Sequence, residues 1–153
     1  MPTTDMGGTN GDRVVYVYNK TRETFVATEA TVADSYLRRL VGLLGKTKRW
    51  ARFGSGLWIV PSRGVHTIGM VFPIDLIFLS KEKEVVHVEE HLRPFRISKV
   101  SLKAMSVLEL PPHTIYRTGT RVGDRLEIAV LGSSPVGEMQ GGSLPPVTEV
   151  QRG

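Results

Sequence analysis

The segment Gly56–Leu79, G-L-W-I-V-P-S-R-G-V-H-T-I-G-M-V-F-P-I-D-L-I-F-L, is the stretch that decides the fold class of this chain. Two apolar runs of strand length flank a polar connector that contains glycine and proline. Such runs are typical of buried β-strands. The second run contains one carboxylate, Asp75, among four large apolar residues. Because burying a carboxylate without partners costs several kcal/mol, Asp75 must be solvated, hydrogen-bonded or paired.

Similar short runs, bounded by glycine, proline and charged residues, occur on both sides of this segment. They predict strands at 14–18, 24–27, 57–60, 65–68, 75–79, 85–89, 106–110 and 125–131. The tip Lys81–Glu84 separates two of them and predicts a charged hairpin turn. No strand–helix alternation is present, which argues against a nucleotide-binding α/β fold.

One helix is predicted, directly after the second strand. Thr31 and Asp34 fit a capping box at its start. Leu37, Leu40, Val41 and Leu44 follow at helical spacing, and Gly45 suits the residue after the helix end. Many short strands with one helix predict a mainly-β fold, an antiparallel sandwich or jelly-roll-like body with one covering α-helix.

The length of 153 residues predicts a single domain with loose ends. Residues 1–12 are rich in Gly, Thr, Asn and Asp, and we expect a disordered N-terminus there. Residues 132–153 contain Gly, Pro and Ser throughout and predict a disordered C-terminal tail. The single mainly-β domain is therefore expected at 13–131.

Composition excludes several kinds of chemistry. The chain has no cysteine, which rules out disulfides, thiolate nucleophiles and cysteine-ligated metals. Its net charge of +5 favours anionic partners without choosing among them. No apolar run approaches the roughly 20 residues of a membrane span, and the first residues lack the pattern of a signal peptide. We expect a cytoplasmic monomer, unless a leader has been removed.

Several short motifs follow one another along the body. In order, they are R-L-V-G-L-L at 39–44, G-L-W at 56–58, P-I-D-L-I-F at 73–78, V-L-E-L at 107–110 and G-D at 123–124. This succession resembles the uncharacterised family called domain of unknown function 192, over roughly residues 25–131. The resemblance implies a compact, mainly-β, jelly-roll-like domain and no established activity. Many members carry Phe-Trp-Met-Lys-Asn-Thr where this chain has V-H-T-I-G-M at 65–70, so no shared catalytic machinery is assumed.

His66 and Asp75 are the first candidates for chemistry. If their two strands are adjacent, they form an imidazole–carboxylate pair, either a general base with its orienting group or two ligands of a metal. In the alternative interpretation, Asp75 accepts backbone amides from the turn at Gly69 or Pro73, and His66 is a half-buried strand residue. We favour this structural interpretation, because two residues fall short of a triad or a three-ligand site. Glu109 faces away from its neighbours in the strand, either to solvent or into a cleft shared with Asp75.

The run His87–His91, H-V-E-E-H, is a second candidate. On a strand its two histidines and Glu89 share one face, but the histidines lie roughly 13 Å apart. That distance is too long for one metal ion, so we expect a solvated face, no metal and no cofactor.

Basic residues from Arg38 to Arg52, with Trp50 and Phe53 among them, could contact nucleic acid. The alternative is that these cations complement the C-terminus of the predicted helix, which is the interpretation that we favour.

No complete catalytic set is present, so whether the protein is an enzyme stays open. The preferred hypothesis is a small non-enzymatic binding or accessory domain that holds an unknown small molecule or peptide. Its cleft is expected near His66, Met70, Phe72 and Asp75, with Glu109 as a further candidate. The alternative is a metal-dependent or His/Asp-based hydrolase built on His66, Asp75 and Glu109. A weaker alternative is nucleic-acid contact through Arg38–Arg52.

Overall fold

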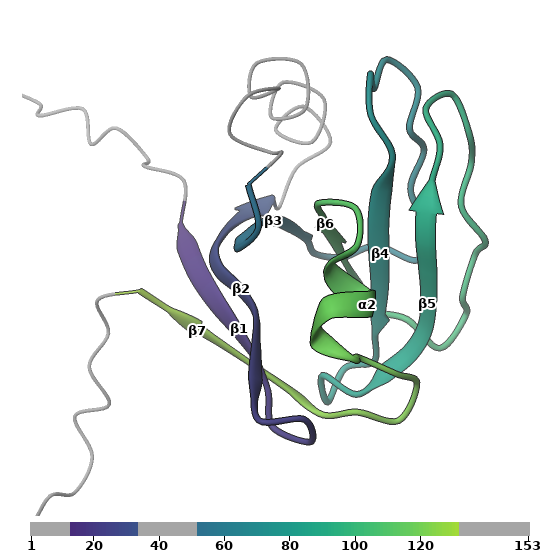
Figure 1. Cartoon of the computed structure of the whole chain (residues 1–153). Helices are drawn as coiled ribbons and strands as arrows, with labels where there is room; N and C mark the ends of the chain where they lie inside the picture. The colour runs from purple at the N-terminus through teal and green to yellow at the C-terminus, as the bar shows by residue number, and fades with distance from the viewer. Residues whose placement is uncertain (1–12, 34–51, 132–153) are drawn as a thin grey trace, which may run out of the picture.

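The computed structural model describes residues 13–33 and 52–131. These residues form one seven-stranded sheet that curls into a half-barrel, together with one short helix (Figure 1). In chain order the elements are β1 (Val14–Asn19), β2 (Thr24–Ala33), β3 (Ser55–Ile59), β4 (Ile74–Leu79), β5 (Val85–Leu92), β6 (Ser106–Leu110), α2 (Thr114–Thr118) and β7 (Leu126–Val130). Across the sheet the strand order is β5-β4-β6-β3-β2-β1-β7. The predicted mainly-β class is confirmed.

The sheet is mixed, with one parallel pair. β2 and β3 run parallel, with Thr31 opposite Leu57, whereas every other neighbouring pair in the described sheet is antiparallel. A parallel pair needs a long crossover connection, and this one runs through residues 34–54. None of the described helices has both the length and the hydropathy that a membrane crossing requires.

Two local predictions were wrong. Thr31 lies inside β2 and pairs with Val14 of β1, so it is no helix cap; most of the predicted helix falls outside the described residues. The predicted strand at 65–68 contributes only an isolated bridge between His66 and Ile97. The helix α2 was not predicted, because five residues carry too little periodicity to be recognised.

Both faces of the central strands are buried. Along β4, Ile74, Leu76 and Phe78 belong to one apolar cluster and Ile77 and Leu79 to the other. This alternation follows from the period of two in a strand. We call the side of Ile77 and Leu79 the inner face and the opposite side the outer face.

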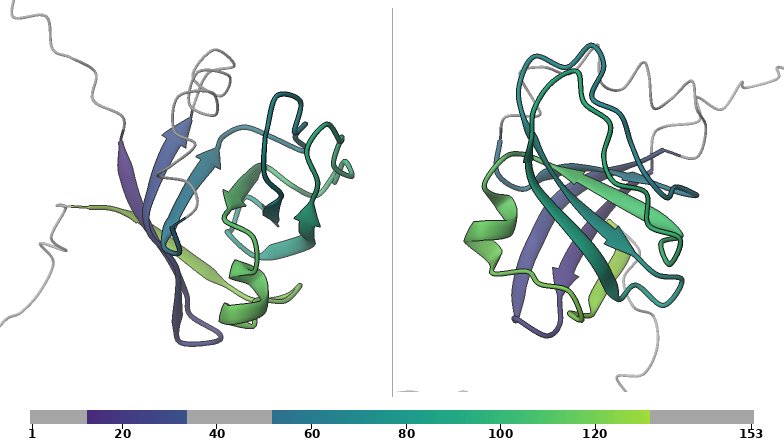
Figure 2. Two further views of the ribbon diagram at one scale, coloured as in Figure 1. Left: turned by 45° about the horizontal axis from the view of Figure 1, so that its top comes forward. Right: turned by 90° about the vertical axis from the view of Figure 1, so that its right-hand side faces the viewer.

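The helix α2 covers the inner face, in the hollow of the curled sheet (Figure 1), where its Ile115 joins the inner cluster. Two loops cover the outer face. Residues 60–73 connect β3 to β4, and residues 93–105 connect β5 to β6; they lie side by side in both views of Figure 2. Met70 and Ala104 pack into the outer cluster from these loops. We call the two segments the paired loops.

The two edge strands of the sheet, β5 and β7, come together at one end and partly close the half-barrel there. An isolated bridge joins Glu84 to Arg125, and the Leu126 N–H donates to the Lys83 carbonyl at 3.0 Å. The hairpin predicted at Lys81–Glu84 therefore contacts the start of the last strand.

The Asp124 carboxylate fixes this closed end. It accepts hydrogen bonds from Asn19 Nδ2 at 2.9 Å, from Arg22 Nε at 3.0 Å and from the Arg121 N–H at 3.0 Å. Burial raises the pKa of Asp124, but the hydrogen bonds and the Arg22 charge outweigh burial and hold the pKa below its ordinary value. The Gly-Asp motif at 123–124 thus has a structural role.

Candidate functional site

A pocket of about 250 Å³ opens where the loops before β3 and β4 meet the segment after β6. The described residues that line it are Phe53, Phe72, Pro111, Pro112, His113 and Arg117. Its volume lies just below the roughly 300–1,000 Å³ of typical ligand pockets. The pocket therefore suits a small ligand or one side chain of a peptide.

The lining combines apolar walls with basic side chains. Two phenylalanine rings and two prolines supply the walls, and His113 and Arg117 supply the polar groups. The Arg117 guanidinium lies over the Phe53 ring, 5.3 Å from its centroid, in a cation–π contact that holds the charge at the pocket. No carboxylate is found among the described lining residues. The pocket is therefore chemically suited to an anionic group attached to an apolar one.

The backbone at His113 places its imidazole. His113 follows two prolines after β6, adopts a left-handed φ of 69° and is the N-cap residue of α2. Its side chain makes no capping hydrogen bond, and its ring lies 5.6 Å from the ring of His91. His113 thus lines the pocket, and its side chain does not cap the helix.

Asp75 provides the cap that His113 does not. Its carboxylate is fully buried: Oδ1 accepts the His91 N–H at 2.9 Å and Oδ2 accepts the Ile115 N–H at 3.0 Å. The first amides of a helix lack intrahelical partners, and a carboxylate is a favoured acceptor for them. Asp75 therefore ties β4 to β5 and to α2. Backbone amides are its partners, as the structural interpretation expected, but they come from His91 and Ile115 rather than from the turn at Gly69 or Pro73.

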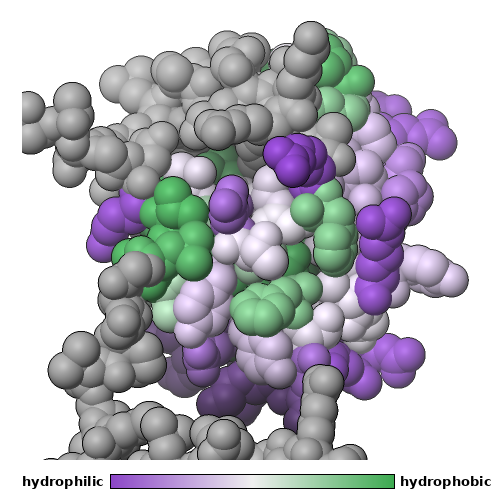
Figure 3. All heavy atoms as spheres, turned by 60° about the vertical axis from the view of Figure 1, so that its left-hand side comes forward, coloured by the Kyte–Doolittle hydropathy of each residue, from purple (hydrophilic) through white to green (hydrophobic). Residues whose placement is uncertain are grey.

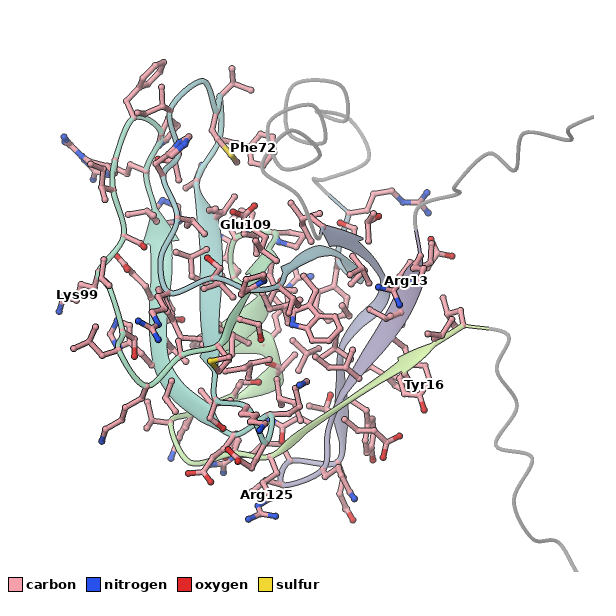
Figure 4. All side chains as sticks on the ribbon, turned by 180° about the vertical axis from the view of Figure 1, so that it is seen from behind. Arg13, Tyr16, Phe72, Lys99, Glu109 and Arg125 are labelled. Atoms are coloured by element: carbon pink, nitrogen blue, oxygen red, sulfur yellow. The ribbon has the colours of Figure 1, made fainter. Side chains whose placement is uncertain are left out.

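The five predicted site residues are not brought together. Phe72 lines the pocket, at the loop end of β4 (Figure 4). Met70 is buried in the outer cluster, and His66 is half-buried in the paired loops, bridged to Ile97. Among the described hydrogen bonds of Asp75, none involves His66.

Glu109 and Asp75 project to opposite faces of the sheet. Asp75 is paired with Leu110, an inner-face residue, whereas Glu109 is paired with Leu57 and Leu76, which belong to the outer cluster. Residues paired across neighbouring strands share a face. Glu109 is almost fully buried within the body of the sheet (Figure 4), so its face is neither solvent nor a cleft shared with Asp75.

The other candidates are dispersed. Within residues 13–33 and 52–131, no three histidine, aspartate or glutamate side chains cluster closely enough to hold a metal ion. In the run at 87–91, His87 is half-buried with its ring 5.1 Å from that of Phe78, whereas His91 is exposed. The basic run Arg38–Arg52 lies outside the described residues except for Arg52, which is exposed.

Five of the lining residues were not predicted as site residues. One of them, Phe53, was named only together with the basic residues of Arg38–Arg52. The segment P-P-H at 111–113 carried the clearest signal, because it places a polar residue in a loop after a predicted strand, where binding residues are often found. No signal in the sequence pointed to Arg117, because the helix that positions it was not predicted.

Comparison with known proteins gives a consistent assignment. The family model described as "Uncharacterized ACR", domain of unknown function 192, matches residues 17–128. The UPF0127 protein of Pyrococcus furiosus is 31% identical over 114 residues, which cover 71% of this chain and 94% of that protein. The UPF0127 protein of Pyrococcus horikoshii is 28% identical over 116 residues, covering 72% and 96%.

Two solved structures share the fold. A protein of unknown function from Novosphingobium aromaticivorans superposes with a TM-score of 0.62 at 19% identity, covering 74% of this chain and 83% of that one. A Sinorhizobium meliloti protein, named as a proposed transcription regulator, has a TM-score of 0.62 at 22% identity, covering 76% and 92%. At these identities the likeness concerns the fold alone.

Proposed function

This chain belongs to the uncharacterised family domain of unknown function 192, and we propose that it is a small non-enzymatic binding module. Its pocket holds a small molecule or a peptide side chain in which an anionic group is joined to an apolar one. The observation that carries this proposal is the lining, in which Phe53, Phe72 and two prolines surround His113 and Arg117.

The physical basis is a cation held against apolar walls. A guanidinium binds carboxylate and phosphate oxygens through two parallel hydrogen bonds, and such bonds strengthen when water is excluded. The cation–π contact with Phe53 favours one position of the exposed Arg117 guanidinium, which reduces the side-chain entropy lost on binding. The two phenylalanine rings then receive the apolar part of the ligand.

Asp75 is a positioning residue in this proposal. Its bond to the Ile115 N–H fixes the start of α2, the helix that carries Arg117 and begins after His113. Its bond to the His91 N–H fixes the backbone of His91, whose ring lies 5.6 Å from the His113 ring. The carboxylate thus supports the segment that carries His113 and Arg117 and does not itself line the pocket.

The hydrolase alternative has less support. Asp75 and Glu109 lie on opposite faces, and both Asp75 oxygens already accept backbone amides. Neither residue is among those that line the pocket.

Isothermal titration calorimetry with a defined panel tests the proposal. The panel contains inorganic phosphate, small aromatic carboxylates and phosphates, and short acidic peptides, each with a neutral analogue. We expect a saturable heat for at least one anionic compound, which Arg117→Gln and Phe72→Ala weaken by about tenfold or more. Arg125→Gln is the matched control, because Arg125 is also exposed but lies at the closed end of the half-barrel. Binding that is absent, or equal in Arg117→Gln and Arg125→Gln, would exclude the pocket.

A further inference from the structure

The paired loops expose large apolar side chains that a folded chain usually buries. Seven such residues are exposed on residues 60–73 and 93–105: Ile68, Val71, Phe95, Ile97, Val100, Leu102 and Met105. Phe95 is 68% exposed and Ile97 is 76% exposed. Large apolar side chains exposed on two adjoining loops are candidates for an interaction surface.

These side chains stand on an ordered support. Thr67 Oγ1 donates to the Arg93 carbonyl at 2.7 Å and accepts the Arg96 N–H at 2.8 Å. The Phe95 N–H donates to the Thr67 carbonyl at 2.9 Å, and Phe95 itself holds a left-handed φ of 58°. Further bonds join the two segments, from the Ser98 N–H to Val65 and from the Ser101 N–H to Arg63. The apolar side chains are therefore presented by a fixed backbone and cannot simply fold inward.

The same loops carry only positive charge. Five exposed cations lie on them: Arg63, Arg93, Arg96, Lys99 and Lys103. Residues 60–73 and 93–105 contain no aspartate or glutamate. The ion pair found in the described part of the chain, between Arg22 and Asp124, involves none of the five. One acidic side chain from β5 contacts these loops: Glu89 Oε2 accepts the backbone N–H of Lys99 at 3.2 Å.

We propose that the paired loops dock on the surface of a bilayer that contains anionic lipids. The aliphatic and phenylalanine side chains enter the boundary between headgroups and acyl chains, and the five cations contact the lipid phosphates and carboxylates. Peripheral binding of this kind needs both buried apolar area and attraction to anionic headgroups. None of the exposed apolar residues or cations of this surface lines the pocket, although Phe72 of the same loop does, and the proposal does not depend on the proposed function.

The composition of the surface favours lipid over nucleic acid. Single-stranded nucleic acid is bound by aromatic side chains on which bases stack, whereas one of the seven exposed residues, Phe95, is aromatic. Aliphatic side chains on these loops add little binding free energy when they contact a phosphate backbone. They add more when they are buried among the acyl chains of a bilayer. On the side of β7, β1 and β2, hydrophobic and hydrophilic residues are interspersed (Figure 3).

Vesicle co-sedimentation of the full chain tests the proposal. One set of vesicles is pure phosphatidylcholine and the other contains about 30% phosphatidylserine, at about 0.1 M salt. We expect binding to the anionic vesicles and little to the neutral ones. The double variant Ile68→Ser with Phe95→Ser should weaken partitioning by roughly tenfold. Arg96→Gln with Lys99→Gln should weaken it by a similar factor and flatten its salt dependence.

A matched apolar control makes the test specific. Val122→Ser with Tyr116→Ser alters side chains that are 59% and 82% exposed, close to the 59% of Ile68 and the 68% of Phe95, but outside the paired loops. This control should bind like the unaltered protein, and melting temperatures identify any variant that fails to fold. The basic residues of Arg38–Arg52 can also attract anionic vesicles. The decisive comparison is therefore between the apolar double variant, Ile68→Ser with Phe95→Ser, and the control. Equal binding of Ile68→Ser/Phe95→Ser and the control, or retention on DNA but not on anionic vesicles, overturns the proposal.

Discussion

The carboxylate of Asp75 accepts the backbone N–H of Ile115 at 3.0 Å, although the two residues are 40 positions apart in the chain. A helix of five residues cannot persist alone, because nucleation is costly and few of its amides find partners within it. The cap that stabilises α2 therefore comes from β4, the strand next to the edge strand β5. Loss of this cap therefore destabilises the fold, and it changes the pocket only through that destabilisation.

Asp75→Asn should lower the stability of the whole domain. The amide keeps one acceptor oxygen but turns an N–H₂ group toward one of the two backbone donors, which loses its partner. A buried donor without a partner costs about 1–3 kcal/mol, which corresponds to a melting temperature lower by several degrees. Thermal and urea unfolding followed by circular dichroism measure the change.

Glu82→Gln is the control for this substitution, since Glu82 is exposed in the turn between β4 and β5. Unchanged or raised stability of Asp75→Asn would mean that the carboxylate is kept for function at a cost in stability.

Stability should fall on acidification through Asp124. Its pKa in the folded state lies below the ordinary value of 3.8, so the folded state binds its proton less readily than the unfolded state. The stabilisation is therefore complete above the ordinary pKa and is lost as the pH falls through the folded pKa. Urea unfolding between about pH 6 and pH 3 should give a shallower pH dependence for Asp124→Asn than for the unaltered protein. Identical slopes would show that the Asn19 and Arg22 contacts contribute nothing.

Two glycines with positive φ should differ in their tolerance of alanine. At Gly54, φ is +99° and an added Cβ would lie 2.7 Å from Thr28 Oγ1; at Gly119, φ is +64° and nothing lies within 4 Å. Gly119→Ala should cost about 1 kcal/mol from backbone strain alone, and Gly54→Ala should cost more. Adding Thr28→Ala should recover the steric part of the Gly54→Ala cost. Equal losses of unfolding free energy at the two sites would contradict this difference.

The sequence predicts most of the sheet, because β-branched residues between turn residues report local structure directly. The strand 106–110 coincides with β6, and the Asp75–Leu79 strand differs from β4 by one residue. The prediction that Thr31 caps a helix was wrong because threonine is also a β-branched residue typical of strands. Its pairing with Val14 and Leu57 places Thr31 in β2. The parallel pairing of β2 with β3 depends on contacts that no local pattern encodes.

The pocket was less predictable than the sheet. Phe72 was predicted as part of a cleft near His66 and Asp75, whereas Arg117 and His113 are positioned by a helix that local patterns do not indicate. Asp75 and Glu109 were predicted as candidate site residues because they are carboxylates among apolar residues. Only the strand register shows that they face opposite sides and that Asp75 serves the backbone.

The proposed pocket is tested most directly by nuclear magnetic resonance titration of the ¹⁵N-labelled chain with phenyl phosphate, a probe that joins a flat ring to an anion. We expect saturable shifts of the Phe72, His113 and Arg117 amides, which Arg117→Gln abolishes and Arg125→Gln preserves. A neutral analogue, benzyl alcohol, should give much smaller shifts. Shifts that do not saturate, or that spread over exposed cations equally in the unaltered protein and in Arg117→Gln, would contradict a binding pocket at this place.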